Sequence, residues 1–172
     1  MLTRTDGQRC VYLTTGQLYF TAEPMLVEMV LGSSLAVVMR SRSRSLSALC
    51  QAFLPRCLTR TGCGGECEQA GLIVECSVMV MADRFRRIGI PHDDIEVNVI
   101  GGADILELES KGAGMYQVGL QNVDAAMERI GHEGLTVAIM DVGGTEGRRL
   151  QFDTGKGEIL VRRLPSLVDE AG

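Results

Sequence analysis

The sequence predicts an α+β protein, in which mostly antiparallel strands form layers and helices lie on the outside. Short apolar runs alternate with turns through most of the chain, which contains 21 glycines. Only two stretches repeat their apolar residues at the spacing of a helix. Neighbouring strands are mostly joined by tight turns, so hairpins dominate a count of about eight strands and two helices.

The length of 172 residues fits one domain with a sizeable core, expected over residues 1–164, with a loose tail over 165–172. A net charge of −5 argues against general nucleic-acid binding. No apolar run is long enough to insert into a membrane. Because the N-terminus has no hydrophobic signal region, we expect a cytoplasmic protein.

The first half of the chain is expected to form strands and hairpins. Residues 10–20 read as two strands or one bent strand. Residues 26–30 and 35–39 are short apolar runs on either side of a small turn, which predicts a hairpin. A second hairpin has its tip at residues 40–45, where arginine alternates with serine, and its return strand at 46–54. We interpret the tip as a solvated loop, with a contact to phosphate or an acidic partner as the alternative.

The turn between the first two strands consists of Gly32, Ser33 and Ser34. A glycine lets the backbone turn sharply, and a small residue after it can present its hydroxyl beside free backbone N–H groups. A nucleophile is displayed next to an oxyanion hole in this way. Most turns of this composition are only turns, so the residues alone leave both interpretations open.

Two helices are expected further along. The first covers residues 72–88, and Gly89 and Pro91 end it. Its inward stripe is Val74, Val78, Met81, Phe85 and Ile88. The second is expected to start with Asn122 as its cap and to end at Gly131. Its inward stripe is expected to be Val123, Ala126, Met127 and Ile130.

The remaining segments predict strands at 95–100 and 135–141 and a terminal hairpin of 148–152 with 158–163. His92 lies in a turn after the first helix, and His132 suits the carboxyl end of the second, so neither is a strong candidate base. A loop holds the cysteines Cys57, Cys63 and Cys67. Their spacing is not that of a zinc site, so we interpret them as free thiols, with a metal or redox site as the minority alternative.

Several motifs together resemble the CheD family of chemoreceptor glutamine deamidases. The first comprises residues 31–37, followed by Leu54 and Pro55 at the end of the second hairpin. Further matches fall in the family's order at 100–103, 118–122, 141–144 with Arg148, and 157–161. The resemblance implies a layered, mostly antiparallel β-sandwich with flanking helices, and no cofactor or metal.

The resemblance also assigns roles to individual positions. The family uses a cysteine and a histidine, assisted by a threonine, and these positions hold Ser34, Gln51 and Glu28 here. Gly32 and Ser33 form the oxyanion turn. A carboxamide neither takes nor gives a proton near neutral pH, and a serine hydroxyl is far less acidic than a thiol. We therefore expect a catalytically impaired homologue.

Two further hypotheses stay open. In one, Ser34 acts as the nucleophile of an active deamidase or amidase, with Glu28 as its base. In the other, the fold serves only as a scaffold for oligomer assembly. For the impaired homologue, the resemblance implies two partners, methyl-accepting chemotaxis receptors and a CheC-like phosphatase.

Overall fold

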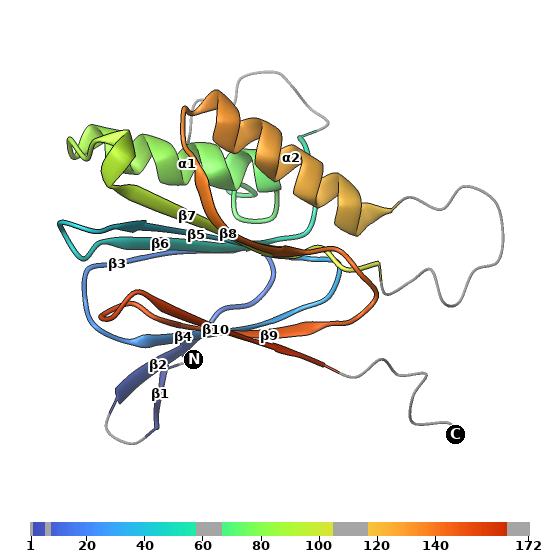
Figure 1. Ribbon diagram of the computed structural model, residues 1–172, viewed down its shortest axis with the longest axis horizontal. Coiled ribbons are helices and arrows are strands. Elements are labelled where there is room, and N and C mark those ends of the chain that lie inside the picture. Colours follow the sequence, from blue (N-terminus) through green and yellow to red (C-terminus); the bar gives the residue numbers. More distant parts are fainter. Residues whose placement is uncertain (1, 6–7, 58–66, 105–116, 165–172) are drawn as a thin grey trace, which may run out of the picture.

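The computed structural model describes residues 2–5, 8–57, 67–104 and 117–164, and Figure 1 shows it as a ribbon. Two five-stranded sheets are stacked face to face, and two helices cover the outer face of one of them. This arrangement confirms the predicted α+β sandwich with flanking helices. The predicted tail, residues 165–172, lies outside the described residues.

The first sheet has the strand order β1-β2-β4-β9-β10. Its members are β1 (Leu2–Thr5), β2 (Gln8–Tyr12), β4 (Leu26–Leu31), β9 (Arg148–Asp153) and β10 (Glu158–Arg163). All neighbours are antiparallel except β2 and β4, which run parallel. The terminal hairpin β9–β10 therefore joins strands from the start of the chain.

The second sheet has the order β3-β6-β5-β7-β8. Its members are β3 (Gln17–Thr21), β6 (Ser47–Ala52), β5 (Leu35–Ser41), β7 (Ile95–Gly101) and β8 (Val137–Val142). Only β7 and β8 are parallel, because the connection between them crosses over through a helix. Residues 10–20 thus form no bent strand: they supply β2 to one sheet and β3 to the other.

Two apolar layers hold the molecule together. One lies between the sheets and includes Val27, Met29 and Leu31 of β4. The other lies between the second sheet and the helices, and includes Val37 of β5 and Cys50 of β6. The second sheet is therefore covered on both faces, which explains why its central strands are nearly continuous apolar runs rather than alternating ones.

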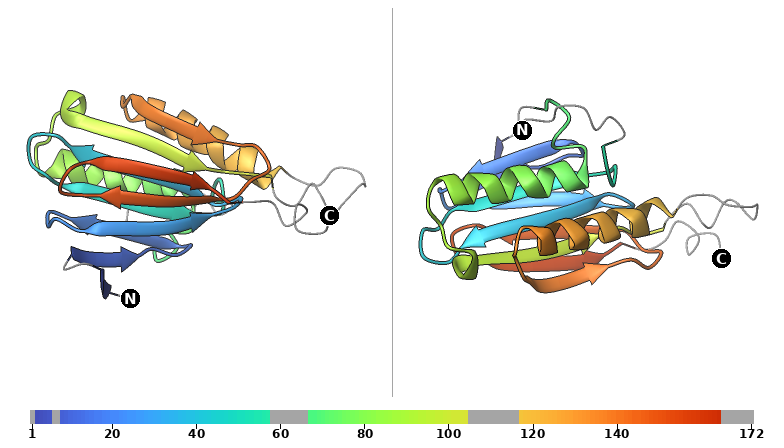
Figure 2. Two further views of the ribbon diagram at one scale, coloured as in Figure 1. Left: turned by 60° about the horizontal axis from the view of Figure 1, so that its bottom comes forward. Right: turned by 90° about the horizontal axis from the view of Figure 1, so that it is seen from above.

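Helix α1 (Val74–Arg87) lies close to its predicted bounds and is followed by the short 3-10 helix η1 (His92–Asp94). Four of the five predicted stripe residues are buried; the fifth, Ile88, is 45% exposed just beyond the helix end. Figure 2 shows α1 and α2 (Val118–His132) side by side across the second sheet. Among the described residues, no helix is long and apolar enough to cross a membrane.

The predicted limits of α2 were wrong at both ends. The helix begins at Val118, so Asn122 is inside it and caps nothing. It continues through Gly131 and His132, and Gly134, with a φ of +71°, follows its last turn. Met127 was placed on the inward face but is 37% exposed, while Ala125 is buried. The buried face of α2 includes Ala125 rather than Met127 because the helix packs against α1 as well as against the second sheet.

The start of α2 packs directly on the end of β7. A Cβ atom added at Gly119 would lie 2.4 Å from the carbonyl oxygen of Gly102, closer than real side chains approach. Glycine at this helical position therefore lets the backbones meet. The contact positions the first turns of α2 beside the Gly32–Ser34 turn, where the candidate site lies.

Candidate functional site

The Gly-Ser-Ser turn connects β4 of the first sheet to β5 of the second, so the hairpin predicted around it is wrong: the chain crosses between the sheets here and the two strands do not pair. The carbonyl groups of all three turn residues accept hydrogen bonds. The amide of Ala103 donates to the carbonyl of Gly32 at 2.9 Å, and the amide of Gly102 donates to that of Ser34 at 2.9 Å. The side chain of Asn122 donates to the carbonyl of Ser33 at 2.9 Å. Segments distant in sequence thus fix the turn.

The amide N–H groups of the turn differ from its carbonyl groups in their hydrogen bonding. Among the described residues, those of Ser33 and Ser34 donate no hydrogen bond. Free N–H groups beside a small side chain are what an oxyanion hole requires. The role of this turn as an oxyanion hole stays a prediction.

Gln51 reaches Ser34 from the neighbouring strand β6. Its Nε2 lies 3.3 Å from the Oγ of Ser34, 2.8 Å from the carbonyl oxygen of Val30 and 3.2 Å from the Oγ1 of Thr15. Both Ser34 and Gln51 are buried, 6% and 4% exposed. The structure therefore brings together two of the three residues that the resemblance singled out.

The orientation of the Gln51 amide follows from its partners. The carbonyl of Val30 can only accept, so the nitrogen and not the oxygen must face it. The Oε1 of Gln51 is then buried with no hydrogen-bond partner among the described residues. Buried polar atoms are rarely left unpaired, which marks this oxygen as a place for water or a ligand donor.

Glu28 lies in a different environment. Its neighbours Val27 and Met29 face the core between the sheets, so strand alternation turns Glu28 to the outer face of the first sheet. There the Nη2 of Arg149 donates to its Oε2 at 2.9 Å, and the Nε2 of Gln151 donates to its Oε1 at 2.6 Å. The hydrogen bond from Arg149 lowers the pKa of Glu28, against the opposing effect of burial.

These contacts decide what the site can do chemically. The Oγ of Ser34 accepts a bond from a carboxamide that has no basic atom, so nothing in contact with it withdraws its proton. The carboxylate of Glu28 is held by Arg149, on the outer face of the sheet. The paired Ser34 and Glu28 of the active-enzyme hypothesis are not in hydrogen-bond contact in the described structure. Among the described residues, no group that takes or gives a proton near neutral pH is hydrogen-bonded to the Oγ of Ser34.

Sequence reasoning missed two residues of this site. Thr15 lies in the loop before β3 and accepts from Gln51, and no local pattern indicates that contact. Asn122 also donates to the carbonyl of Phe53 at 2.8 Å, so it joins the turn to the end of β6. A signal for Asn122 did exist: it is a polar residue next to the inward-facing Val123 of an amphipathic helix.

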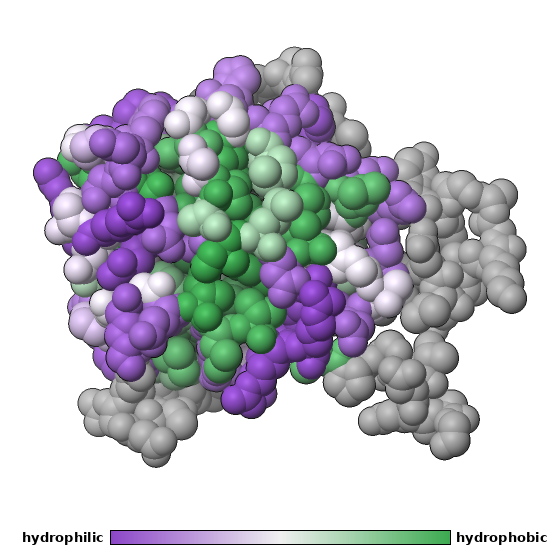
Figure 3. Space-filling view, viewed as in Figure 1, coloured by the Kyte–Doolittle hydropathy of each residue, from purple (hydrophilic) through white to green (hydrophobic). Residues whose placement is uncertain are grey.

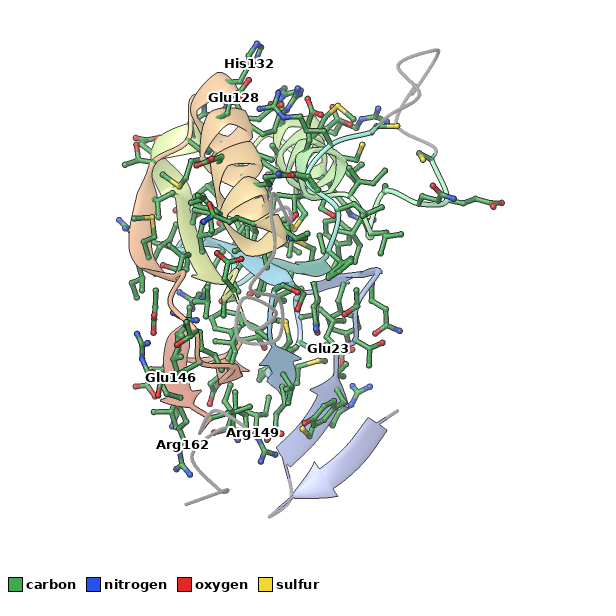
Figure 4. All side chains as sticks on the ribbon, turned by 90° about the vertical axis from the view of Figure 1, so that its right-hand side faces the viewer. Glu23, Glu128, His132, Glu146, Arg149 and Arg162 are labelled. Carbon is green, nitrogen blue, oxygen red and sulfur yellow. The ribbon has the colours of Figure 1, made fainter. Side chains whose placement is uncertain are left out.

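The other candidates do not join this site. Burial raises the pKa of the Cys50 thiol to about 11, and this side chain faces the helices. His132 and Glu128 lie on α2 at one end of the view in Figure 4, while Arg149 lies at the other. Cys57 and Cys67 are half-buried, and Cys63 lies outside the described residues. No cluster of metal-binding side chains is found in the part of the chain that the structure describes.

The hairpin tip at residues 40–45 is held by one carboxylate. Asp94 accepts from the hydroxyl of Ser41 at 2.5 Å, and from the amide and the hydroxyl of Ser43 at 3.0 and 2.7 Å. Hydrogen bonds from these two serines lower the pKa of Asp94. The tip is therefore ordered by its own serines.

Fold and site together define a layered α+β protein with a Gly-Ser-Ser turn between its two sheets, where Ser34 contacts Gln51. Within that class, the chain belongs to the CheD family. The family model described as CheD chemotactic sensory transduction matches residues 59–163. This range begins after Ser34 and Gln51, so the match rests on the second half of the fold.

Relatives are similar over nearly the whole chain. The probable chemoreceptor glutamine deamidase CheD 2 of Geobacter sulfurreducens is 37% identical over 90% of this chain and 89% of its own. The probable chemoreceptor glutamine deamidase CheD of Maridesulfovibrio salexigens is 34% identical over 91% and 92%. The chemoreceptor glutamine deamidase CheD of Thermotoga maritima is 26% identical over 81% and 82%.

Proposed function

We propose that this chain is a chemosensory CheD-family protein that binds chemoreceptor glutamines but deamidates them poorly or not at all. The observation that carries the proposal is the contact between Ser34 and Gln51, at the positions where the resemblance puts a cysteine and a histidine. The family membership supports a receptor partner, because the relatives are named for action on chemoreceptor glutamine.

Side-chain deamidation makes specific demands on a site. A nucleophile must attack the carboxamide carbon, and an acid must give a proton to the departing ammonia. Water must then hydrolyse the acyl intermediate. No base contacts Ser34 among the residues that the structure describes, and Gln51 cannot act as the acid. Loss of such groups commonly removes a factor on the order of 10⁴ to 10⁶ from the rate.

Recognition of a carboxamide demands less. Because the Oγ of Ser34 accepts its bond from Gln51, its hydroxyl proton is available to a substrate carbonyl. The unpartnered Oε1 of Gln51 is an acceptor suited to a substrate NH₂ group, once a local movement uncovers it. One donor and one acceptor match the two ends of a glutamine side chain. Binding can thus persist where turnover does not.

The experiment is a mass-spectrometric deamidation assay on the cytoplasmic segment of a chemoreceptor. We expect no one-dalton gain at receptor glutamines with the natural chain. A gain that disappears in Ser34→Ala would instead establish the active-enzyme hypothesis. The triple variant Glu28→Thr, Ser34→Cys, Gln51→His is expected to gain activity. Its failure would mean that the substrate-binding geometry has also changed.

Partners are tested separately. We propose that the protein acts in the cytoplasm and binds receptors there, and that a CheC-like phosphatase is its second partner. Pull-down of the full chain against receptor segments and CheC-like proteins, with Ser34→Trp to fill the turn, measures both. Binding that is lost in this variant supports the site. Self-association alone, with no receptor binding, would favour the scaffold hypothesis.

A further inference from the structure

Strand β10 is the last strand of the first sheet, and no described strand pairs with its outer edge. The free N–H and C=O groups of such an edge are a template for another strand. Strand β8, the last strand of the second sheet, lies at the same side of the sandwich in Figures 1 and 2. The guanidinium of Arg163 in β10 donates to the carboxylate of Asp141 in β8 at 3.0 Å, which agrees with those views.

This side of the molecule also exposes apolar side chains. Ile139 and Met140 of β8 are 45% and 56% exposed, and Leu160 of β10 is 48% exposed. Figure 3 shows apolar residues gathered in the middle of the face that carries both edges. Apolar surface along unpaired strand edges usually marks an interaction site.

The charges of β10 face like charges within their own sheet. Glu158 lies directly opposite Asp153, and Arg162 lies directly opposite Arg149. Like charges placed opposite each other on antiparallel strands are destabilising. Lys156 lies 4.0 Å from both carboxylates of the first pair and relieves it. Arg162 has no ion pair among the described residues, and Figure 4 shows it projecting away from the body of the protein.

We propose that β10 pairs with β10 of a second copy of this chain, antiparallel about a two-fold axis at Leu160. A two-fold axis perpendicular to the sheet keeps outward residues opposite outward residues. Leu160 then meets Leu160 of the second copy, and Glu158 meets Arg162 of the second copy. By symmetry Arg162 meets the other Glu158, so both charges gain an opposite partner across the interface.

The inner face of the paired edge is also compatible with this register. Ile159 would lie opposite Val161 of the second copy, and both already pack against the core between the sheets. Because β8 lies beside β10, the same axis brings the two exposed β8 edges toward each other. A register centred on Val161 would instead place Leu160 against Arg162, and it loses the charge match.

Charged residues on an edge strand often prevent pairing with another chain. Charges of a single sign do so by repelling an identical edge. Two of the three charges of β10, Glu158 and Arg162, have opposite signs and lie at equal distances on either side of Leu160, while the third, Arg163, pairs with Asp141 and Glu146 of its own chain. This arrangement attracts an identical antiparallel strand, which is why the second copy fits better than an unrelated partner.

Sedimentation velocity of the full chain at low salt tests the proposal over a series of concentrations. We expect the mass to rise from that of the 18.6 kDa chain to twice that value. Either Glu158→Arg or Arg162→Glu sets like charges opposite each other at both symmetry-related positions. Each is expected to raise the dissociation constant by about tenfold or more. The exposed Glu68→Arg is the matched control and should leave it unchanged.

Charge complementation separates this interface from a general loss of stability. The double variant Glu158→Arg, Arg162→Glu restores opposite charges and should dimerise again. An equal mixture of the two single variants should form a mixed dimer, since each supplies what the other lacks. A monomer at every concentration would overturn the proposal, as would single variants that dimerise like the natural chain. Dimerisation lost in Met140→Glu but kept in both charge reversals would place the interface on β8 and also overturn it.

Discussion

Gln51 donates from Nε2 to the hydroxyl oxygen of Ser34 at 3.3 Å and, from the same nitrogen, to the carbonyl of Val30 at 2.8 Å. One NH₂ group, with two protons, thus connects β6 to the end of β4 and to the turn that follows it. The side chain of Gln51 is therefore a fixed donor that neither takes nor gives a proton near neutral pH. The amide therefore contributes to the fold of the turn as well as to its chemistry.

The first prediction concerns the stability that this amide provides. Gln51→Met keeps the length of the side chain but removes the donor of the Val30 carbonyl from a buried position. We expect the free energy of unfolding to fall by about 1–3 kcal/mol, measured by urea denaturation. Gln121→Met, on the exposed side of α2, is the control and should change it by less than about 0.5 kcal/mol. Equal effects of the two variants would refute a structural role.

A second prediction concerns Asn122, which holds the carbonyls of Ser33 and Phe53 with one nitrogen. Asn122 is fully buried, and Asn122→Ala removes the donor of both carbonyls. The expected loss is about 2–4 kcal/mol in the free energy of unfolding, again by urea denaturation. Asp124→Ala, exposed on the same helix, is the matched control. A loss no larger than in that control would show that water replaces the amide.

The close approach of α2 to β7 gives a third prediction, with a control in the same helix. Gly119→Ala gains helix propensity, but its methyl group would overlap the carbonyl of Gly102. We expect a net loss of about 1–3 kcal/mol in the free energy of unfolding. At Gly131 a methyl group meets nothing within 4 Å, so Gly131→Ala should be neutral or stabilising by up to about 1 kcal/mol. Thermal unfolding of both variants provides the measurement, and a stable Gly119→Ala would contradict the model of the packing.

The periodicity of apolar residues was sufficient to predict elements that are determined by their own sequence. Four of the five stripe residues of α1 are buried, and the second predicted hairpin, β5 with β6, pairs as expected. The hairpin predicted around Gly32–Ser34 is wrong, because β4 belongs to the first sheet and β5 to the second. Periodicity failed where contacts between segments distant in sequence determine where an element begins or what a side chain binds. The start of α2 is set by the contact of Gly119 with β7, and Asn122 is occupied by carbonyls from two other loops. The contact of Gly119 has no local signature, and the inward position of Asn122 indicates a buried polar group without indicating its partners.

The candidate site was predictable to the same extent. The contact of Ser34 with Gln51 follows from hairpin geometry and from the resemblance, whereas the support from Thr15 does not. For Glu28, the alternation of β4 carried the relevant information: its apolar neighbours face the core, so its carboxylate must face outward. Strand alternation therefore outweighs closeness in sequence when the groups of a site are assigned.

The outward carboxylate of Glu28 gives the last prediction, on pH dependence. The hydrogen bond from Arg149 lowers the pKa of Glu28 in the folded state, so the folded protein binds fewer protons at this group than the unfolded chain does. Its contribution to stability is complete above the unfolded pKa and is lost as the pH falls through the folded pKa. We expect the free energy of unfolding to fall between about pH 5 and pH 3 as this group is protonated.

Urea denaturation of three variants across that pH range isolates the contribution of Glu28 to the pH dependence of the free energy of unfolding. Glu28→Gln cannot titrate and should lose part of the pH dependence. Arg149→Ala removes the largest cause of the lowered pKa and should lose a similar part. Glu68→Gln, on the exposed surface, should keep the slope of the natural chain. An unchanged slope in Glu28→Gln would mean that other carboxylates carry the acid sensitivity.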